Sequence, residues 1–168
     1  MKQVYAIAII AGLLGIAAWL SKPAKIPETG KVAEIEDAGT VVLGSGQRVR
    51  YLGVNIPAQE ECFGDLAREA NESLLGKRIR LEKDPLAEKA PDGAYLRYVY
   101  FTPEKEEIFI NTRIIEGGFG FPLLHKEMIH HNEMAAAGRY ASATGRGLWG
   151  ECEVEEVSPG VFKTNPNQ

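Results

Sequence analysis

Apolar and polar positions alternate along several short segments of the chain, which is the pattern of half-buried β-strands. Alternating or β-branched runs occupy residues 31–36 (KVAEIE), 40–43 (TVVL), 47–54 (QRVRYLGV), 77–83 (KRIRLEK) and 94–101 (AYLRYVYF). Glycine-containing turns separate the first three runs, which predicts a β-meander. The sequence therefore predicts five strands, of which three are consecutive.

Segments with apolar residues repeated every three or four positions predict helices between and after these strands. One such stripe covers residues 60–75, and another helix is expected over 126–143. A short helix over 112–116 is expected behind a capping Asn111. Five strands with about three flanking helices form a mainly β, α+β arrangement whose element order fits a five-stranded OB-fold barrel. We expect residues 153–168 to be a flexible tail because they are acidic and then rich in Pro and Asn.

An uncharged apolar run, Val4 through Leu20, precedes the alternating region. As a helix it would span about 25 Å, slightly less than a hydrocarbon core of ~30 Å. Tyr5 and Trp19 lie near its ends, where aromatic rings favour the membrane interface. We predict that residues 1–21 form an N-terminal apolar helix that anchors the protein in a membrane, with the domain outside the cytoplasm. A cleaved signal, which would give a secreted protein, and a buried helix are the alternatives.

Residues 22–29 contain two prolines and no apolar periodicity, which is typical of a linker, and residues 30–152 then form the globular domain. The two cysteines, Cys62 and Cys152, are too far apart for a local CxxC motif. They can pair outside the cytoplasm. Closing so long a loop stabilises a fold by about 4 to 5 kcal/mol in the chain-entropy model. We predict this disulfide, with two buried free thiols as the alternative.

The charge balance bears on possible partners. The formal net charge is -4, and residues 30–152 alone hold 15 Lys+Arg and 19 Asp+Glu. This balance disfavours a protein that binds nucleic acid mainly through bulk positive charge. A local groove is still conceivable, because OB-folds bind single strands with a basic track and stacking aromatic rings. Arg48, Arg50 and Tyr98 are the candidates for such a groove, but the charge balance favours surface charge or core packing as the role of each.

The three histidines lie on or beside the last predicted helix, close to two glutamates. His130 and Glu133 are three residues apart on one helical face, as are Glu127 and His130, so a metal site is conceivable. His130 and His131, however, diverge by about 100° around a helix. We expect these residues and His125 to form a solvated helix face rather than a metal site.

Five short motifs occur in a fixed order within the domain. They are VRYLGVNIP (49–57), FGDLA (63–67), LRYVY (96–100), the pair IN (110–111) leading to a GG pair, and GLW (147–149). Each motif is weak alone, but the order and spacing are specific. Together they resemble the staphylococcal nuclease (thermonuclease) family over about residues 30–152. The resemblance implies an OB-fold and a calcium-dependent phosphodiesterase that cuts DNA and RNA.

The chemistry implied by this resemblance needs carboxylates for a hard cation, a general base for water and arginines for the phosphorane charge. At the two positions where the family has metal-binding carboxylates, this sequence has Gly39 and Asn55. The position of the family's general base holds Ala58. Asp37 matches another aspartate of the family, one that lies nearer the outer coordination shell of the ion, and is a weak candidate ligand for Ca²⁺. The first family arginine survives as Arg50, the residual catalytic position.

The second family arginine falls on Ala94, and Arg97 cannot replace it because the two positions face opposite sides of a strand. One lost catalytic group commonly costs several orders of magnitude in rate, so four losses predict that the family activity is absent. We therefore predict a binding or interaction module without a cofactor, whose partner is a nucleic acid or a protein. A divergent but active calcium-dependent nuclease, using Asp37 and Arg50 with Glu60 or Glu61, is the alternative.

Overall fold

The computed structural model describes residues 25–166. The apolar run at residues 4–20, which carries the anchor prediction, lies outside the described residues. Within residues 25–166, no helix has both the length and the apolar character needed to cross a membrane.

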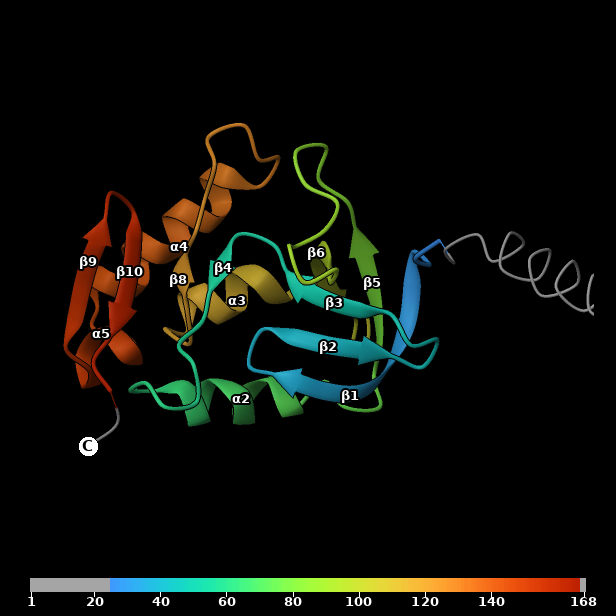
Figure 1. The fold of residues 1–168 in the computed structure, drawn as a ribbon, viewed down its shortest axis with the longest axis horizontal. Coiled ribbons are helices and arrows are strands. Elements are labelled where there is room, and N and C mark those ends of the chain that lie inside the picture. Colours follow the sequence, from blue (N-terminus) through green and yellow to red (C-terminus); the bar gives the residue numbers. More distant parts are fainter. Residues whose placement is uncertain (1–24, 167–168) are drawn as a thin grey trace, which may run out of the picture.

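Five strands close into a mixed barrel of the OB-like type (Figure 1). The sheet order is β3-β2-β1-β5-β6, and β3 also pairs with β6 in parallel, while the other barrel pairs are antiparallel. The strands are β1 (Thr29–Asp37), β2 (Thr40–Leu43), β3 (Arg48–Tyr51), β5 (Arg78–Glu82) and β6 (Tyr95–Phe101). The alternating runs thus predicted the barrel strands, and the fold is α+β as expected.

The barrel interior is apolar because alternate side chains of each strand point inward. Val32, Val41 and Val49 are each 0% exposed, and Val99 joins them from β6. Burying a side chain of this size stabilises the folded state by about 1.5 to 3 kcal/mol. The same alternation that marked these strands in the sequence therefore also supplies the core.

The helices lie outside the barrel, and the first and last of the three predicted helices begin later than the sequence predicted. They are α2 (Gly64–Glu72), α3 (Ile110–Glu116), α4 (His131–Ala143) and the single turn α5 (Leu148–Glu151), with short strands β4 (Val54–Asn55), β7 (Ile108–Phe109) and β8 (Phe121–Pro122). Phe63, just before α2, has a φ of 74°, which a helix cannot accommodate. Before α4, the Ile129 amide donates to the Asp84 carboxylate at 3.1 Å instead of continuing a helix.

Asn111 does not cap α3, which corrects the sequence-based prediction. It lies within the helix, is 0% exposed, and joins the helix to the barrel. Its side chain accepts from the Val99 amide at 2.8 Å and donates to the Leu52 carbonyl at 2.9 Å and the Arg97 carbonyl at 3.2 Å. Buried backbone groups need such partners. The helix α3 begins two residues earlier than predicted, at Ile110.

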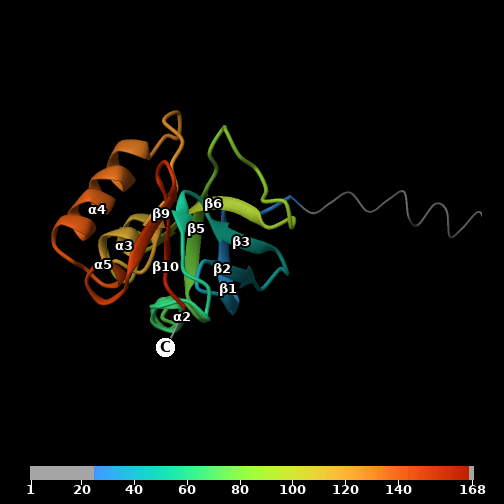
Figure 2. The same cartoon turned by 60° about the vertical axis from the view of Figure 1, so that its left-hand side comes forward.

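The prediction of a flexible tail over 153–168 is wrong for most of its length. A hairpin of β9 (Val154–Ser158) and β10 (Val161–Thr164) lies beside α4 and α5 (Figures 1 and 2). Cys62 and Cys152 form a disulfide at the base of this hairpin. The Thr164 hydroxyl also donates to the Cys62 carbonyl at 3.0 Å. The globular unit therefore extends past residue 152.

Candidate functional site

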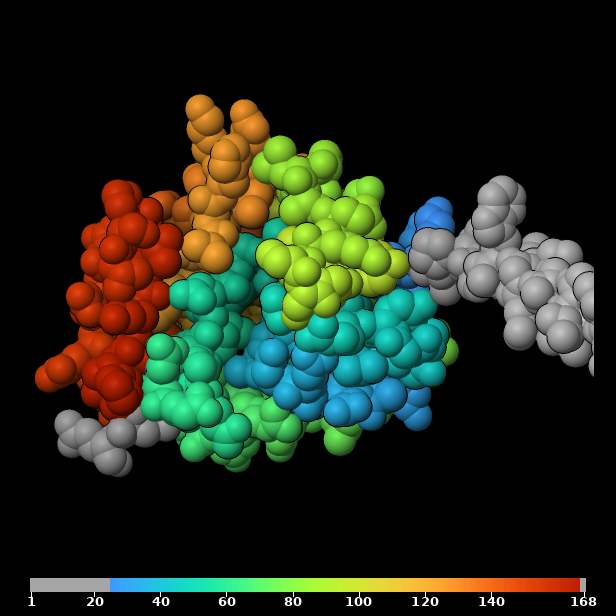
Figure 3. Space-filling model, viewed as in Figure 1, coloured from blue at the N-terminus to red at the C-terminus, as the bar shows by residue number. Residues whose placement is uncertain are grey.

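A cleft of about 500 Å³ lies between the β1–β2 turn, β3 and the loop from β4 to α2. In Figure 3 it is the hollow between the blue β1–β2 segment and the blue-green loop that leads to α2. The residues at the positions that matter for the family resemblance line it together: Asp37, Gly39, Arg50, Asn55 and Ala58. The structure thus brings into one cleft residues that come from three separate sequence segments.

The β1–β2 turn presents one carboxylate to this cleft, and its own backbone binds it. Asp37 Oδ1 accepts a hydrogen bond from the Gly39 amide at 2.8 Å. A Cβ added to Gly39 would lie 3.1 Å from Cδ1 of Ile56, an apolar neighbour across the cleft. The nearest neighbour of a side chain at this position would therefore be a methyl group, with the Asp37 carboxylate oxygen farther away at 3.8 Å.

The loop from β4 to α2 offers no replacement carboxylate. Asn55 donates through Nδ2 to the Phe162 carbonyl of the C-terminal hairpin at 2.8 Å. Glu61 accepts from the Ala58 amide at 2.8 Å and so closes its own loop. Neither Glu60 nor Glu61 lines the cleft. The rearranged loop on which the alternative nuclease hypothesis depends therefore has no structural support.

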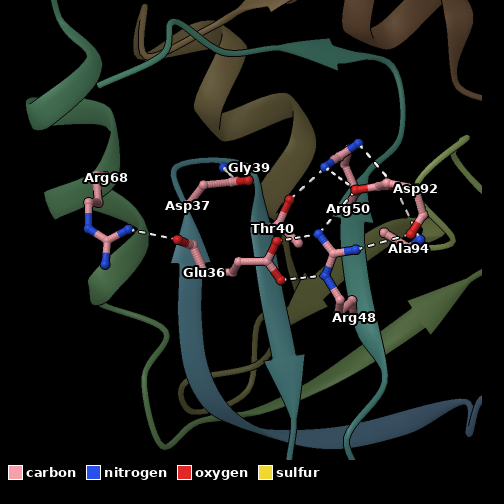
Figure 4. Close-up of polar contacts among 9 residues, drawn as sticks. All are labelled: Glu36, Asp37, Gly39, Thr40, Arg48, Arg50, Arg68, Asp92 and Ala94. Carbon is pink, nitrogen blue, oxygen red and sulfur yellow. Dashed lines mark hydrogen bonds and ion pairs between the residues drawn. The ribbon is translucent and has the colours of Figure 1, made fainter. Parts of the chain in front are cut away.

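Arg50 is held by Asp92, a residue that the sequence analysis missed (Figure 4). The Arg50 guanidinium reaches the Asp92 carboxylate at 2.9 and 3.4 Å and the Thr40 hydroxyl at 3.3 Å. Arg48 donates to the same carboxylate at 3.0 Å. Asp92 belongs to the loop before β6, and the parallel pairing of β6 with β3 brings this loop to the two arginines.

The charges of this cluster are mutually satisfied. Partial burial raises the pKa of the Asp92 carboxyl, but the Ala94 amide, the Arg48 guanidinium and the charge of Arg50 hold it below its ordinary value. A hydrogen bond from Arg48 likewise lowers the pKa of Glu36. At neutral pH both carboxylates are therefore ionised, and Arg50 faces an anion from its own chain.

Neither Ala94 nor Arg97 supplies a second arginine to the cleft; Arg68 lines it, but donates to the Glu36 carbonyl at 2.9 Å (Figure 4) and the Ile35 carbonyl at 3.3 Å. Ala94 is 0% exposed. Arg97 is 3% exposed and donates to the Glu88 carboxylate at 2.7 Å and to the Leu96 carbonyl at 2.7 Å. Hydrogen bonds from Lys83 and Arg97 lower the pKa of Glu88 to about 2. Arg97 is thus a buried, ion-paired residue outside the cleft.

Tyr98, a candidate for contacting nucleic acid, has instead the other role that the sequence analysis gave it, in the core. Tyr98 is 0% exposed and donates through its hydroxyl to Asp84 at 2.7 Å. Tyr100, also buried, stacks on Phe109 with ring centroids 4.8 Å apart. Both faces of β6 are covered, one by the barrel core and the other by the cluster under α3 and α4. A ring in this position cannot stack on a base.

His130 is not on a solvated helix face, which corrects a second prediction. Its ring packs edge-on against Tyr98 with centroids 4.6 Å apart, and Nε2 lies 3.0 Å from the Tyr100 hydroxyl. Glu82 is 3.4 Å and Glu133 3.6 Å from the ring nitrogens. Across residues 25–166, no three His, Cys, Asp or Glu side chains are grouped so as to hold a metal ion.

Calcium does not fit the residues of the cleft. The ion takes six to eight oxygen ligands, with several from carboxylates. Here Glu36 is paired with Arg48, and Asp37 is bound by the backbone of its own turn. The family's two inner carboxylates are absent, so we derive no step through the ion. The cleft therefore lacks the family's inner carboxylates and its base, and the guanidinium of Arg50 is paired with Asp92.

Comparisons with known proteins do not assign the chain to a family. No protein-family model matches it, and no curated protein matches it. The relationship to staphylococcal nuclease therefore stays a prediction from the ordered motifs.

Proposed function

We propose that this chain is a staphylococcal-nuclease-like OB-fold domain that lacks the family's calcium-dependent nuclease activity and serves as a binding or interaction module. The ordered motifs and the five-stranded barrel support the family relationship. The pairing of Arg50 with Asp92 supports the loss of activity most directly. Arg50 is the one group of the family's catalytic set that is retained, and an internal carboxylate occupies it.

Two separate losses support this proposal. The guanidinium of Arg50 is neutralised, and the cleft has Gly39, Asn55 and Ala58 where the family has carboxylates. Removing Asp92 would reverse the first loss and leave the second. An Asp92→Asn variant is therefore expected to stay inactive, because no group is present to bind calcium or activate water.

The test is the release of acid-soluble nucleotides from single-stranded DNA by the full chain, with calcium or with a chelator. We expect no calcium-dependent release by the wild type or by Asp92→Asn. Release that requires calcium and disappears in Arg50→Ala would overturn the proposal in favour of the divergent nuclease. Activity seen only in Asp92→Asn would show that occlusion of Arg50, rather than lost carboxylates, silences the enzyme.

We further propose that residues 1–21 anchor the domain in a membrane, with the domain on the extracytoplasmic side. The disulfide between Cys62 and Cys152 supports this placement, because disulfides persist mainly in oxidising compartments. Membrane fractionation followed by mass spectrometry of the N-terminus tests it. An intact N-terminus in the membrane fraction is expected; a shortened chain in the soluble fraction would favour the cleaved signal.

A protein is the favoured partner, since the arginines proposed for nucleic acid are paired internally and Tyr98 is buried. Crosslinking in intact membranes, followed by purification of the full chain, is expected to recover a protein. Recovery of nucleic acid alone would contradict this choice.

A further inference from the structure

A second, apolar groove of about 620 Å³ lies away from the cleft, between α4 and the C-terminal hairpin. Figure 2 shows α4 and the hairpin side by side. Pro122 and Trp149 line it together with Gly160 and Phe162 of the hairpin. Its volume is within the range of sites for small organic ligands, about 300 to 1,000 Å³.

The groove has fixed walls. Trp149 packs edge-on against Phe121 with centroids 5.0 Å apart, and Phe162 contacts both rings at 5.4 and 5.6 Å. The Phe162 carbonyl accepts from Asn55, and the disulfide ties the segment before the hairpin to Cys62. The hairpin is therefore held at several points, and a ligand would enter a formed site without ordering it first.

The opposite wall is a face of α4 made of small side chains. Residues of this face that line the groove recur at helical spacing: Ala135, Gly138, Ser142 and Ala143. A Cβ at Gly138 would lie 2.6 Å from Cγ of Pro122, so the glycine lets the helix approach β8 closely. Small side chains on one wall and aromatic rings on the other leave a channel that suits an unbranched hydrocarbon chain.

Arg139 supplies the polar group of this site. It is the only charged residue among the described residues that line the groove, and its side chain is exposed. Within residues 25–166 it makes no hydrogen bond or ion pair, whereas Arg48, Arg80 and Arg97 are all paired with carboxylates. A guanidinium in this state complements a carboxylate, which it can bind through two parallel hydrogen bonds.

We propose that this groove binds an anionic amphiphile, with its hydrocarbon chain against Trp149 and Phe162 and its carboxylate on Arg139. The chain gains affinity from burial of its apolar surface. The carboxylate sets the orientation, because the rest of the lining offers no second charge. This site is separate from the cleft and does not depend on whether nuclease activity is absent.

The experiment uses the full chain in phosphatidylcholine nanodiscs with the substitution Trp19→Phe, which leaves Trp149 as the sole tryptophan. Dodecanoate is titrated while Trp149 emission is recorded, with dodecanol as the uncharged ligand. Partition of the ligand into the bilayer is the same for every variant. The ratio of the titration midpoints of two variants therefore reports the difference in their affinity at the groove. We expect a saturable change with dodecanoate.

Arg139→Gln should weaken dodecanoate binding about tenfold, the effect of one lost charge-assisted contact. Arg113→Gln is the matched control on an exposed helix position that lies outside the groove. Dodecanol binding should not respond to either change. Ser142→Phe, which fills the channel, should abolish the response to both ligands while the circular dichroism spectrum stays native.

Three results would overturn the proposal. One is the absence of any saturable change in Trp149 emission. Another is an unaltered titration in Ser142→Phe, which would place the ligand elsewhere. The third is an equal response of Arg139→Gln and Arg113→Gln to dodecanoate, which would remove the carboxylate from Arg139.

Discussion

Replacing Asn111 with alanine should destabilise the domain by about 2 to 4 kcal/mol. Asn111 is 0% exposed and binds Val99, Leu52 and Arg97 through their backbones at 2.8, 2.9 and 3.2 Å. In the variant, the Arg97 carbonyl still accepts a hydrogen bond from the Leu52 amide at 3.0 Å. The two groups left without their Asn111 partner are therefore the Val99 N–H and the Leu52 carbonyl. Each unsatisfied buried group costs about 1 to 3 kcal/mol, and entry of a water would place the sum in the lower part of this range.

Urea unfolding of the full chain, followed by circular dichroism, measures this loss. Asn132→Ala, at an exposed position of α4, is the matched control and should change stability by less than about 0.5 kcal/mol. An Asn111→Ala loss no larger than that of the control would refute the assignment of Asn111 as the link between α3 and the barrel.

Asn111→Asp adds a pH test of the same contact. A carboxylate would face the Leu52 and Arg97 carbonyls, so the folded state should raise the pKa of the new carboxyl above its unfolded value near 4. The variant should therefore be most stable below about pH 4 and lose stability as the pH rises through the folded pKa. If the stability of Asn111→Asp did not change as the pH rises from below about 4 to neutral, the inferred contact with the two carbonyls would be contradicted.

Three further predictions concern the disulfide, the cleft and a buried carboxylate. Cys152→Ser should lower stability by about 4 to 5 kcal/mol in urea unfolding, because the unfolded chain regains the entropy of a long loop; reductant should then have no further effect. Asp92→Asn should bind inorganic phosphate several-fold more tightly by calorimetry, since Arg50 loses its internal anion; an unchanged affinity would contradict occlusion. Burial raises the pKa of Asp84, but two backbone amides and the Tyr98 hydroxyl outweigh it, so the folded state lowers this pKa. As the pH drops below about 4, the wild type should therefore lose stability. Asp84→Asn should show a weaker dependence of stability on pH in acid unfolding.

The barrel was predictable from the sequence because its strands have one face in the core and show alternation. The run 47–54 was predicted as one strand, yet Gly53, with a φ of 76°, separates β3 from β4. Met134 of α4 also leaves no room for a side chain here, since its Cε would lie 2.9 Å from a Cβ at position 53, a contact that local sequence does not reveal. The sequence also contains an indication of the C-terminal hairpin, because Pro159-Gly160 lies between two valine-containing runs and is a turn pattern. The acidic and then Pro- and Asn-rich composition of this segment favours a flexible tail instead and so hides that pattern.

The site was predictable in its positions but not in its pairing. The family resemblance assigns Asp37, Arg50 and Asn55 to one site, and the structure puts all three in one cleft. The contact between Arg50 and Asp92 depends on the parallel closure of β3 on β6, which no local pattern encodes. The sequence alone did not establish the burial of Tyr98, because alternation identifies a buried face only when the other face is exposed, and β6 is covered on both.

The cleft and the C-terminal hairpin meet at Asn55. Its Nδ2 donates to the Phe162 carbonyl, and Phe162 forms a wall of the apolar groove. An aspartate at this position would have no N–H to donate to the Phe162 carbonyl and would place a negative oxygen beside it. The carbonyl would then be left without its partner, which costs free energy for a partly buried group. A metal-binding carboxylate and this anchor of the hairpin therefore exclude each other at position 55. An Asn55→Asp change would therefore remove one of the contacts that hold the hairpin, and with it one support of the wall formed by Phe162.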